Sequence, residues 1–343
     1  MGKDCKYKVS TRCFTYNHSE YILDTMNGFV MQETNFPVVS CIVDDASTDK
    51  NQDIIRAFFE TNFNVGDPEV AYQEETDYGT IMYAQHNTNK NCFFAILLLK
   101  ENHYRQKRKK EPYLNRWAAS SEYIAMCEGD DYWTDPTKLQ KQVDYMDSHP
   151  ECILSVHAAE WRMDDALFPG GCQESSPMSY TVEELIRCGG FYFATASFFF
   201  RVELENDWPR WGLKADVGDL PLQIQAGLRG EVHYLPDKMC VYRYQSRGSW
   251  SSKVQKPEVN IAFQKNKIEW MTLLDEDTGH KYQRAIYDQL FQHYNSLFNL
   301  REIGFGEYAK AVLKSGKKRY GRLLKDFCRF YLTPVYRVLK KFK

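Results

Sequence analysis

The sequence lacks the features of a membrane-spanning protein and of a disulfide-bonded scaffold. Its longest apolar run, from Phe93 to Leu99, is far shorter than the about 20 residues that cross a bilayer. The ten cysteines form neither C-x-x-C pairs nor the Cys/His spacings of zinc sites. No apolar signal-peptide core follows the first six residues. We therefore expect a cytoplasmic protein in a reducing compartment.

Net charge is also small, at -2, but it is unevenly distributed. Residues 310–343 carry twelve Lys/Arg and a single acid, Asp326, so this basic tail has a charge of +11 and the remainder has -13. Leucines and aromatics alternate with its basic residues, which is typical of a helix lying on anionic lipid at the inner face of the plasma membrane. A solvated basic helix packed on the domain is the alternative. No nucleic-acid-binding motif is present, so we expect no nucleic acid partner.

What the sequence does contain is an alternation of strand and helix patterns. Residues 8–14 and 37–43 are strand candidates, and the second is a β-branched run typical of a strand buried on both faces. A helix is expected from about Ser19, and another is marked by Ile54, Ile55 and Phe58. Such alternation predicts a parallel sheet, which binds its ligands at the carboxyl ends of the strands.

Later segments extend this pattern. Phe93–Leu99 is a strand or a buried helix, and the basic stretch 100–116 is a loop beside the site or an ordinary surface loop. A strand at 123–127 precedes a helix that we expect Asp135 and Pro136 to open. Further strands are expected at 153–158 and 194–200, with helices from about 258. The predicted domains are a catalytic domain, 1–255, and a helical C-terminal extension, 256–343.

Two acidic clusters follow strands of this pattern. Asp44-Asp45 comes after one strand, and Glu128-Gly129-Asp130-Asp131 after another. Clustered carboxylates repel one another unless a cation or hydrogen-bond donors compensate them. Mg²⁺ and Mn²⁺ suit a few carboxylates together with phosphate oxygens, and a diphosphate leaving group gains most from such an ion. Simple helix capping by these aspartates is the alternative.

Three motifs together carry a family resemblance. In order they are Val9-Ser10 with Thr15-Tyr16-Asn17, then Ile42 to Asp49, then Tyr123 to Trp133. The chain resembles family 2 glycosyltransferases of the GT-A fold over roughly residues 8–250. The resemblance implies a Rossmann-like, mostly parallel sheet flanked by helices. It also implies inverting transfer of a sugar from a nucleoside-diphosphate sugar to an acceptor hydroxyl, in polysaccharide or glycolipid assembly.

The resemblance also implies roles for the residues of the two clusters. Thr15, Tyr16 and Asp45 would line the nucleoside pocket, with Asp45 or Asp44 contacting the base or ribose. Asp130 would bind Mg²⁺ or Mn²⁺. Glu128 stands at the first position of the family's Asp-x-Asp motif and would face the ribose, or the metal through water.

The catalytic base is expected at the start of a late helix, where Val217 to Leu222 matches the family. Asp219 is the predicted base, Asp216 is its competitor, and capping of the helix is the structural alternative for Asp219. Trp133, Arg243 and Trp250 are expected to contact the diphosphate or a glycan or lipid-linked acceptor; core packing is the alternative for the tryptophans.

The same residues are also compatible with two other functions. A two-carboxylate glycosidase would act without nucleotide or metal. A non-catalytic nucleotide or sugar binder would tolerate loss of Asp219. Arg12, inside the first strand candidate, requires a buried partner or an exposed edge.

Overall fold

The structure is a computed structural model, and it describes residues 6–171, 176–246, 248–315, 320–327 and 331. The chain divides into two compact units. The first comprises residues up to 180 together with 190–207 and 225–253, and the second comprises 181–189, 208–224 and the residues from 254 onward. The second unit thus includes two segments that precede the C-terminal region in sequence.

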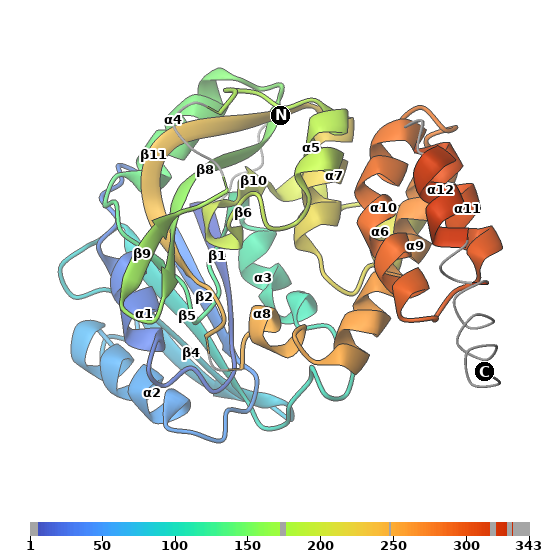
Figure 1. Cartoon of the computed structure of the whole chain (residues 1–343). Coiled ribbons are helices and arrows are strands. Elements are labelled where there is room, and N and C mark those ends of the chain that lie inside the picture. The colour runs from blue at the N-terminus through green and yellow to red at the C-terminus, as the bar shows by residue number, and fades with distance from the viewer. Residues whose placement is uncertain (1–5, 172–175, 247, 316–319, 328–330, 332–343) are drawn as a thin grey trace. The chain divides into compact units, whose positions relative to one another are not determined.

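The first unit is built on a sheet (Figure 1). The described residues of this sheet form eleven strands. Four neighbouring strands at its centre run parallel: β5 (Cys92–Leu99), β2 (Val38–Asp44), β1 (Tyr7–Thr15) and β6 (Ser121–Met126). Every residue of β2 is buried, as its β-branched run predicted. The expected mostly parallel central sheet is therefore confirmed, and Phe93–Leu99 is a strand.

Antiparallel pairs extend both sides of this centre. Beyond β5 lie β4 (Gly79–Gln85) and β3 (Ala71–Glu75). Beyond β6 the order is β10 (Phe199–Arg201), β8 (Cys152–Met163), β11 (Glu231–Arg243) and β7 (Tyr132–Trp133), and β9 (Ala166–Pro169) pairs with β8. The pair β8 and β11 is parallel.

Helices bury both faces of the sheet. On one face α1 (Ile22–Val30), α2 (Asn51–Asn62) and α4 (Lys138–Ser148) contribute apolar side chains to one core with β1, β2 and β5. On the other face Leu114 and Trp117, from η1 (Glu111–Leu114) and α3 (Asn115–Ala118), pack on Val39, Cys41 and Leu97. The basic stretch expected as a loop therefore ends in two short helices.

The strand register brings three strand ends together. Thr15, the last residue of β1, pairs with Asp44, the last residue of β2. The amide of Asp45 donates to the Thr15 carbonyl, and the amide of Gly129, after β6, donates to the Phe14 carbonyl. The two acidic clusters consequently flank the end of β1.

Two local expectations were wrong. The helix expected at Asp135 begins at Lys138, because the Asp135 carboxylate accepts hydrogen bonds from the amide and hydroxyl of Thr137 and so forms a turn ahead of the helix. The segment 194–200 is not one strand. It starts with a 3₁₀ turn, Thr195–Ser197, in which the amide and hydroxyl of Ser197 donate to the Ala194 carbonyl.

The second unit is helical in its described residues. Its helices are α5 (Val182–Cys188), α6 (Arg210–Lys214), the start of α7 (Asp219–Arg229), α9 (Pro257–Asp277), α10 (Gln283–Asn299), α11 (Phe305–Lys314) and α12 (Tyr320–Phe327). Trp211, Trp270 and Tyr308 lie in their shared core. Most of the basic tail expected to contact a membrane lies outside the described residues. Within the described part of the chain, no helix is both long and apolar enough to cross a bilayer.

Candidate active site

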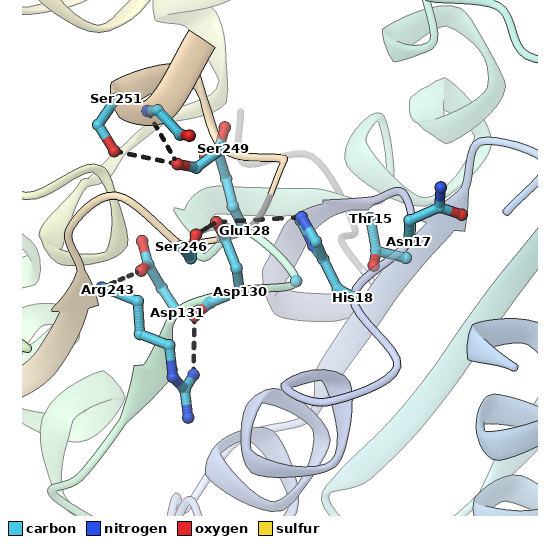
Figure 2. Close-up of polar contacts among 12 residues, drawn as sticks. Thr15, Asn17, His18, Glu128, Asp130, Asp131, Arg243, Ser246, Ser249 and Ser251 are labelled. Atoms are coloured by element: carbon cyan, nitrogen blue, oxygen red, sulfur yellow. Dashed lines mark hydrogen bonds and ion pairs between the residues drawn. The ribbon is translucent and has the colours of Figure 1, made fainter. Parts of the chain in front are cut away.

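Asp130 lies at the centre of a polar cluster in the first unit. Its side chain is buried, and its Oδ2 accepts a 2.7 Å hydrogen bond from the Ser246 hydroxyl. The same oxygen lies 3.9 Å from Nε2 of His18. Figure 2 shows the imidazole of His18 and the hydroxyl of Ser246 both directed at the Asp130 carboxylate. Burial lowers the pKa of His18, and the Asp130 charge opposes this effect.

The loop that carries Asp130 is held rigidly by its neighbours. The Asp131 carboxylate accepts from the Arg243 amide at 2.8 Å, and its carbonyl accepts from the Thr25 hydroxyl at 2.6 Å. The Arg243 guanidinium donates to the Asp130 carbonyl (Figure 2). It also pairs with Asp24. Burial raises the pKa of Asp131 well above its usual range, and the Asp130 charge adds to the effect. Asp131 therefore positions the loop that carries Asp130.

Gly129 lets this loop approach the end of β1. A Cβ at this position would lie 2.5 Å from Cβ and Oγ1 of Thr15 and 3.2 Å from Nδ1 of His18. Any larger residue would push the loop away from both side chains. The glycine of the Glu128-Gly129-Asp130 motif is thus explained by close packing.

Asp44 and Asp45 shape the neighbouring edge in different ways. The Asp44 carboxylate accepts from Asn51 at 2.7 Å and from Gln52 at 2.6 Å, so it fixes the turn into α2. Asn51 also donates to the Thr15 hydroxyl at 3.1 Å. Asp45 accepts from the amides of residues 103 and 104 and from the Lys110 ammonium at 3.1 Å. It therefore anchors the basic stretch to the strand ends.

Cations of the basic stretch and of α8 (Trp250–Lys253) gather beside this edge. Arg105 donates to the Tyr16 hydroxyl at 3.3 Å. The ammonium groups of Lys110 and Lys253 lie 5.9 and 5.3 Å from the ring centroid of Tyr104. Desolvation lowers the pKa of Lys253, whereas the charges of Asp130 and Glu128 raise it, so this ammonium lies within electrostatic range of the acidic motif.

A polar cleft of about 500 Å³ opens near the same loop. It is bounded by the start of α1, the turn after β8 and the end of β11. Its lining includes Glu20, Tyr21, Asp24, Arg162, Tyr244 and Ser246. Because Ser246 also donates to Asp130, the cleft lies close to the acidic motif.

Comparison with known proteins places the chain in a family. No model of a known protein family matches the chain. A protein of Mycobacterium bovis is 30% identical over 326 residues, which cover 89% of this chain and 78% of that protein. Proteins of two Mycobacterium tuberculosis strains match with the same identity and coverage. The chain belongs to the family of these mycobacterial proteins. All three of these proteins are uncharacterised.

Solved structures identify the fold of this family member. Residues 1–349 of Staphylococcus aureus TarS in complex with UDP-GlcNAc match with a TM-score of 0.56 and 17% identity, over 89% of this chain and 79% of that one. The same protein in complex with UDP matches with a TM-score of 0.53 and 16% identity, over 84% and 72%. The chain has the GT-A glycosyltransferase fold, which confirms the fold expected from the sequence.

Within this GT-A fold, two of the side chains expected at the diphosphate or acceptor make contacts with the protein itself. Trp133 is 2% exposed and packs edge-on against Phe29, and its indole nitrogen donates to the Ala196 carbonyl. Neither face of its ring is therefore available for stacking on a sugar. Arg243 is buried and its guanidinium binds Asp24 and the Asp130 carbonyl, so it braces the loop, and it also lines the polar cleft. Trp250 is half-buried, and Glu128 is exposed.

Asp219 belongs to the second unit. It is the first residue of α7, and its carboxylate accepts from the Leu220 amide at 2.7 Å. Desolvation raises its pKa, and the positive charge of buried Lys267 counteracts that shift. The competitor Asp216 is exposed. A carboxylate that is desolvated and has a raised pKa is a stronger base than an exposed aspartate.

The residues around Asp130 fit a divalent ion. A buried carboxylate and a buried imidazole converge there, and exposed Glu128 lies on the same loop. Among the described residues no group of three or more His, Cys, Asp or Glu side chains is placed to hold a metal ion, so phosphate or water would have to supply the other ligands. An open site with few protein ligands is the kind that Mg²⁺ and Mn²⁺ use when phosphates complete their coordination.

Sequence reasoning missed His18, Ser246, Lys110 and Lys253. His18 directly follows the Thr15-Tyr16-Asn17 motif, and this position could have indicated that it belongs to the site. Ser246 and Lys253 are more than a hundred residues from Asp130, and no spacing rule connects them. Lys110 was part of the basic stretch, but nothing distinguished it from the other cations there.

Proposed function

We propose that this protein is a glycosyltransferase that moves a sugar from a nucleoside-diphosphate sugar to an acceptor hydroxyl, with inversion at the anomeric carbon. The observation that carries the proposal is the buried Asp130 carboxylate, set beside the ends of β1 and β2 between His18 and Ser246. This is the edge at which open α/β sheets bind their ligands. The GT-A fold is consistent with this chemistry, and polysaccharide or glycolipid assembly is the process we infer.

The donor nucleoside is proposed to bind over Thr15, Tyr16 and the turn that Asp44 and Asp45 shape. Its diphosphate would lie toward Asp130, with Lys253 near enough to offset its negative charge. A divalent ion held by Asp130 would stabilise the charge that accumulates on the departing nucleotide. The cleft lined by Tyr21 and Tyr244 is our candidate for the acceptor glycan or lipid-linked sugar.

Asp219 is proposed as the base that takes the proton from the acceptor hydroxyl. Its raised pKa supports this role, because a base is most effective when its pKa approaches the working pH. The acceptor oxygen would then attack the anomeric carbon from the side opposite the departing nucleotide, which inverts the configuration.

The first experiment is a thermal-shift panel of UDP-, GDP-, dTDP- and CMP-sugars with Mn²⁺. A donor at about 100 times its Kd stabilises the folded protein by about 2.7 kcal/mol. Asp130→Asn should abolish the Mn²⁺-dependent part of this shift, whereas Asp144→Asn, which alters an exposed aspartate of α4, should leave it unchanged. Equal shifts in both variants would refute the assignment of Asp130.

Turnover separates the transferase from its alternatives. Nucleotide released from the stabilising donor should require an acceptor and cease with EDTA. Asp219→Asn should reduce release by about 100-fold or more while donor binding persists. Hydrolysis that needs neither nucleotide nor metal would instead identify a glycosidase. Donor binding with no turnover by the unaltered protein would identify a binding protein.

A further inference from the structure

His18 occupies a fixed position at the end of β1. The preceding residue, Asn17, has a positive φ of 58°, and its side chain accepts from the Thr48 amide at 2.7 Å. The carbonyl of His18 accepts from the amides of Tyr21 and Ile22 at the start of α1. The backbone on both sides of His18 is therefore held in place.

The imidazole of His18 lacks the partners that a structural histidine normally has. Its side chain is nine-tenths buried, and Nδ1 has no hydrogen-bond partner. Nε2 lies 3.9 Å from Oδ2 of Asp130, which is too long for a hydrogen bond. Nε2 of His18 and Oδ2 of Asp130 therefore face each other without bonding directly, at a separation that a shared third partner can bridge.

A metal ion accounts for this separation. Metal–nitrogen and metal–oxygen bonds for ions of this size are about 2.0–2.2 Å, so two ligand atoms of one ion lie about 3 Å apart when adjacent and up to about 4.2 Å apart when opposite. The 3.9 Å between Nε2 of His18 and Oδ2 of Asp130 falls within that limit. Ser246 donates to the same carboxylate and would orient it toward the ion, as outer hydrogen bonds commonly do.

We propose that His18 is the second protein ligand of the donor-site divalent ion, after Asp130, and that it makes the site select Mn²⁺ over Mg²⁺. The inference rests on the proposed function, since the donor diphosphate would supply the remaining ligands. Imidazole is a good ligand for transition-metal ions, whereas Mg²⁺ strongly prefers oxygen. The side chain at position 18 would therefore set which metal the enzyme uses.

The test is pulsed EPR of the full-length protein with Mn²⁺ and UDP. A directly bound imidazole gives ¹⁴N modulation of the Mn²⁺ echo. We expect this signal in the unaltered protein, its loss in His18→Gln, and its retention in His280→Gln, which changes an exposed histidine of the second unit. Titration should also show that His18→Gln weakens Mn²⁺ binding by about 10–100-fold, with a smaller loss for Mg²⁺.

The outcomes separate this inference from the proposed function. Mn²⁺ that binds the unaltered protein without ¹⁴N modulation, or modulation that persists in His18→Gln, overturns the role of His18 alone. Mn²⁺ binding that is insensitive to Asp130→Asn overturns the metal site of the proposed function as well. The measurement on the unaltered protein is decisive even if a variant folds poorly.

Discussion

Arg12 pairs with Glu205, and this pair explains how a charged residue lies inside the central parallel sheet. Arg12 is in β1, between β2 and β6, and its side chain is 9% exposed. Glu205 ends η3 (Val202–Glu205), the short helix after β10, and is 22% exposed. The partner required by the sequence is thus supplied from a segment nearly two hundred residues away.

Replacing Glu205 should therefore destabilise the first unit. Glu205→Gln leaves a nearly buried guanidinium without its counter-charge, and we expect a loss of about 2–3 kcal/mol, below the 3–5 kcal/mol of a fully buried pair. Urea denaturation measures the change. Glu203→Gln, which alters an exposed carboxylate of the same short helix, is the control. Equal midpoints for the two variants would show that the pair contributes nothing.

Asp45 should control the order of the basic stretch. It accepts two backbone hydrogen bonds and one from Lys110, and hydrogen bonds to a charged group contribute about 1.5–3 kcal/mol each. Asp45→Ala should thus speed tryptic cleavage after Arg105 and the lysines that follow it. Asp53→Ala, at an exposed position of α2, should cleave at the original rate. An unchanged cleavage pattern in Asp45→Ala would contradict the anchoring role.

The part of the site that follows from strand order could be predicted from sequence. Thr15, Asp44 and Gly129 come together because the carboxyl ends of parallel strands share one edge. The direction of individual side chains could not be predicted. Trp133 faces the core because β7 pairs with β11 and faces α1, and those contacts join residues far apart in sequence.

Lys138 should make stability depend on pH in a defined direction. It is fully buried beside Trp133, donates to Gln142 at 2.7 Å, and burial lowers its pKa to about 7. Between pH 7 and about 10 the unfolded chain binds a proton that the folded one does not, so stability rises with pH through this range. Lys138→Met should remove that rise.

The change of stability with pH is the quantity to measure. Lys138→Met also leaves the Gln142 carbonyl unpaired, but the cost of this loss does not depend on pH. Thermal denaturation at pH 7, 8.5 and 10 gives this pH dependence. Lys141→Met, on the exposed side of α4 with a raised pKa, is the control and should retain the rise due to Lys138. A slope in Lys138→Met equal to that of the unaltered protein would mean that the ammonium is not desolvated.

Asp219 should lower the stability of the second unit near neutral pH while it supports turnover. Its folded-state pKa is raised above the usual 3.8, so its stabilising contribution is complete below that pH and is lost as pH rises through the folded value. Asp219→Asn should therefore gain stability relative to the unaltered protein between pH 4 and pH 7, while turnover falls. Asp216→Asn should do neither. A gain in stability without a loss of turnover would mean that Asp219 only caps the helix and does not act as the base.

The basic tail is best tested by charge reversal, because truncation at residue 310 would remove Ala311 and Val312, which are buried in the second core. Each lysine near an anionic surface contributes about 1 kcal/mol. Reversing Lys340, Lys341 and Lys343 to Glu should thus lower binding to phosphatidylglycerol vesicles by about 100-fold or more in flotation. High salt should mimic the change, since it screens the same charges. Equal flotation on neutral and anionic vesicles would exclude an electrostatic membrane contact and favour a tail that packs on the protein.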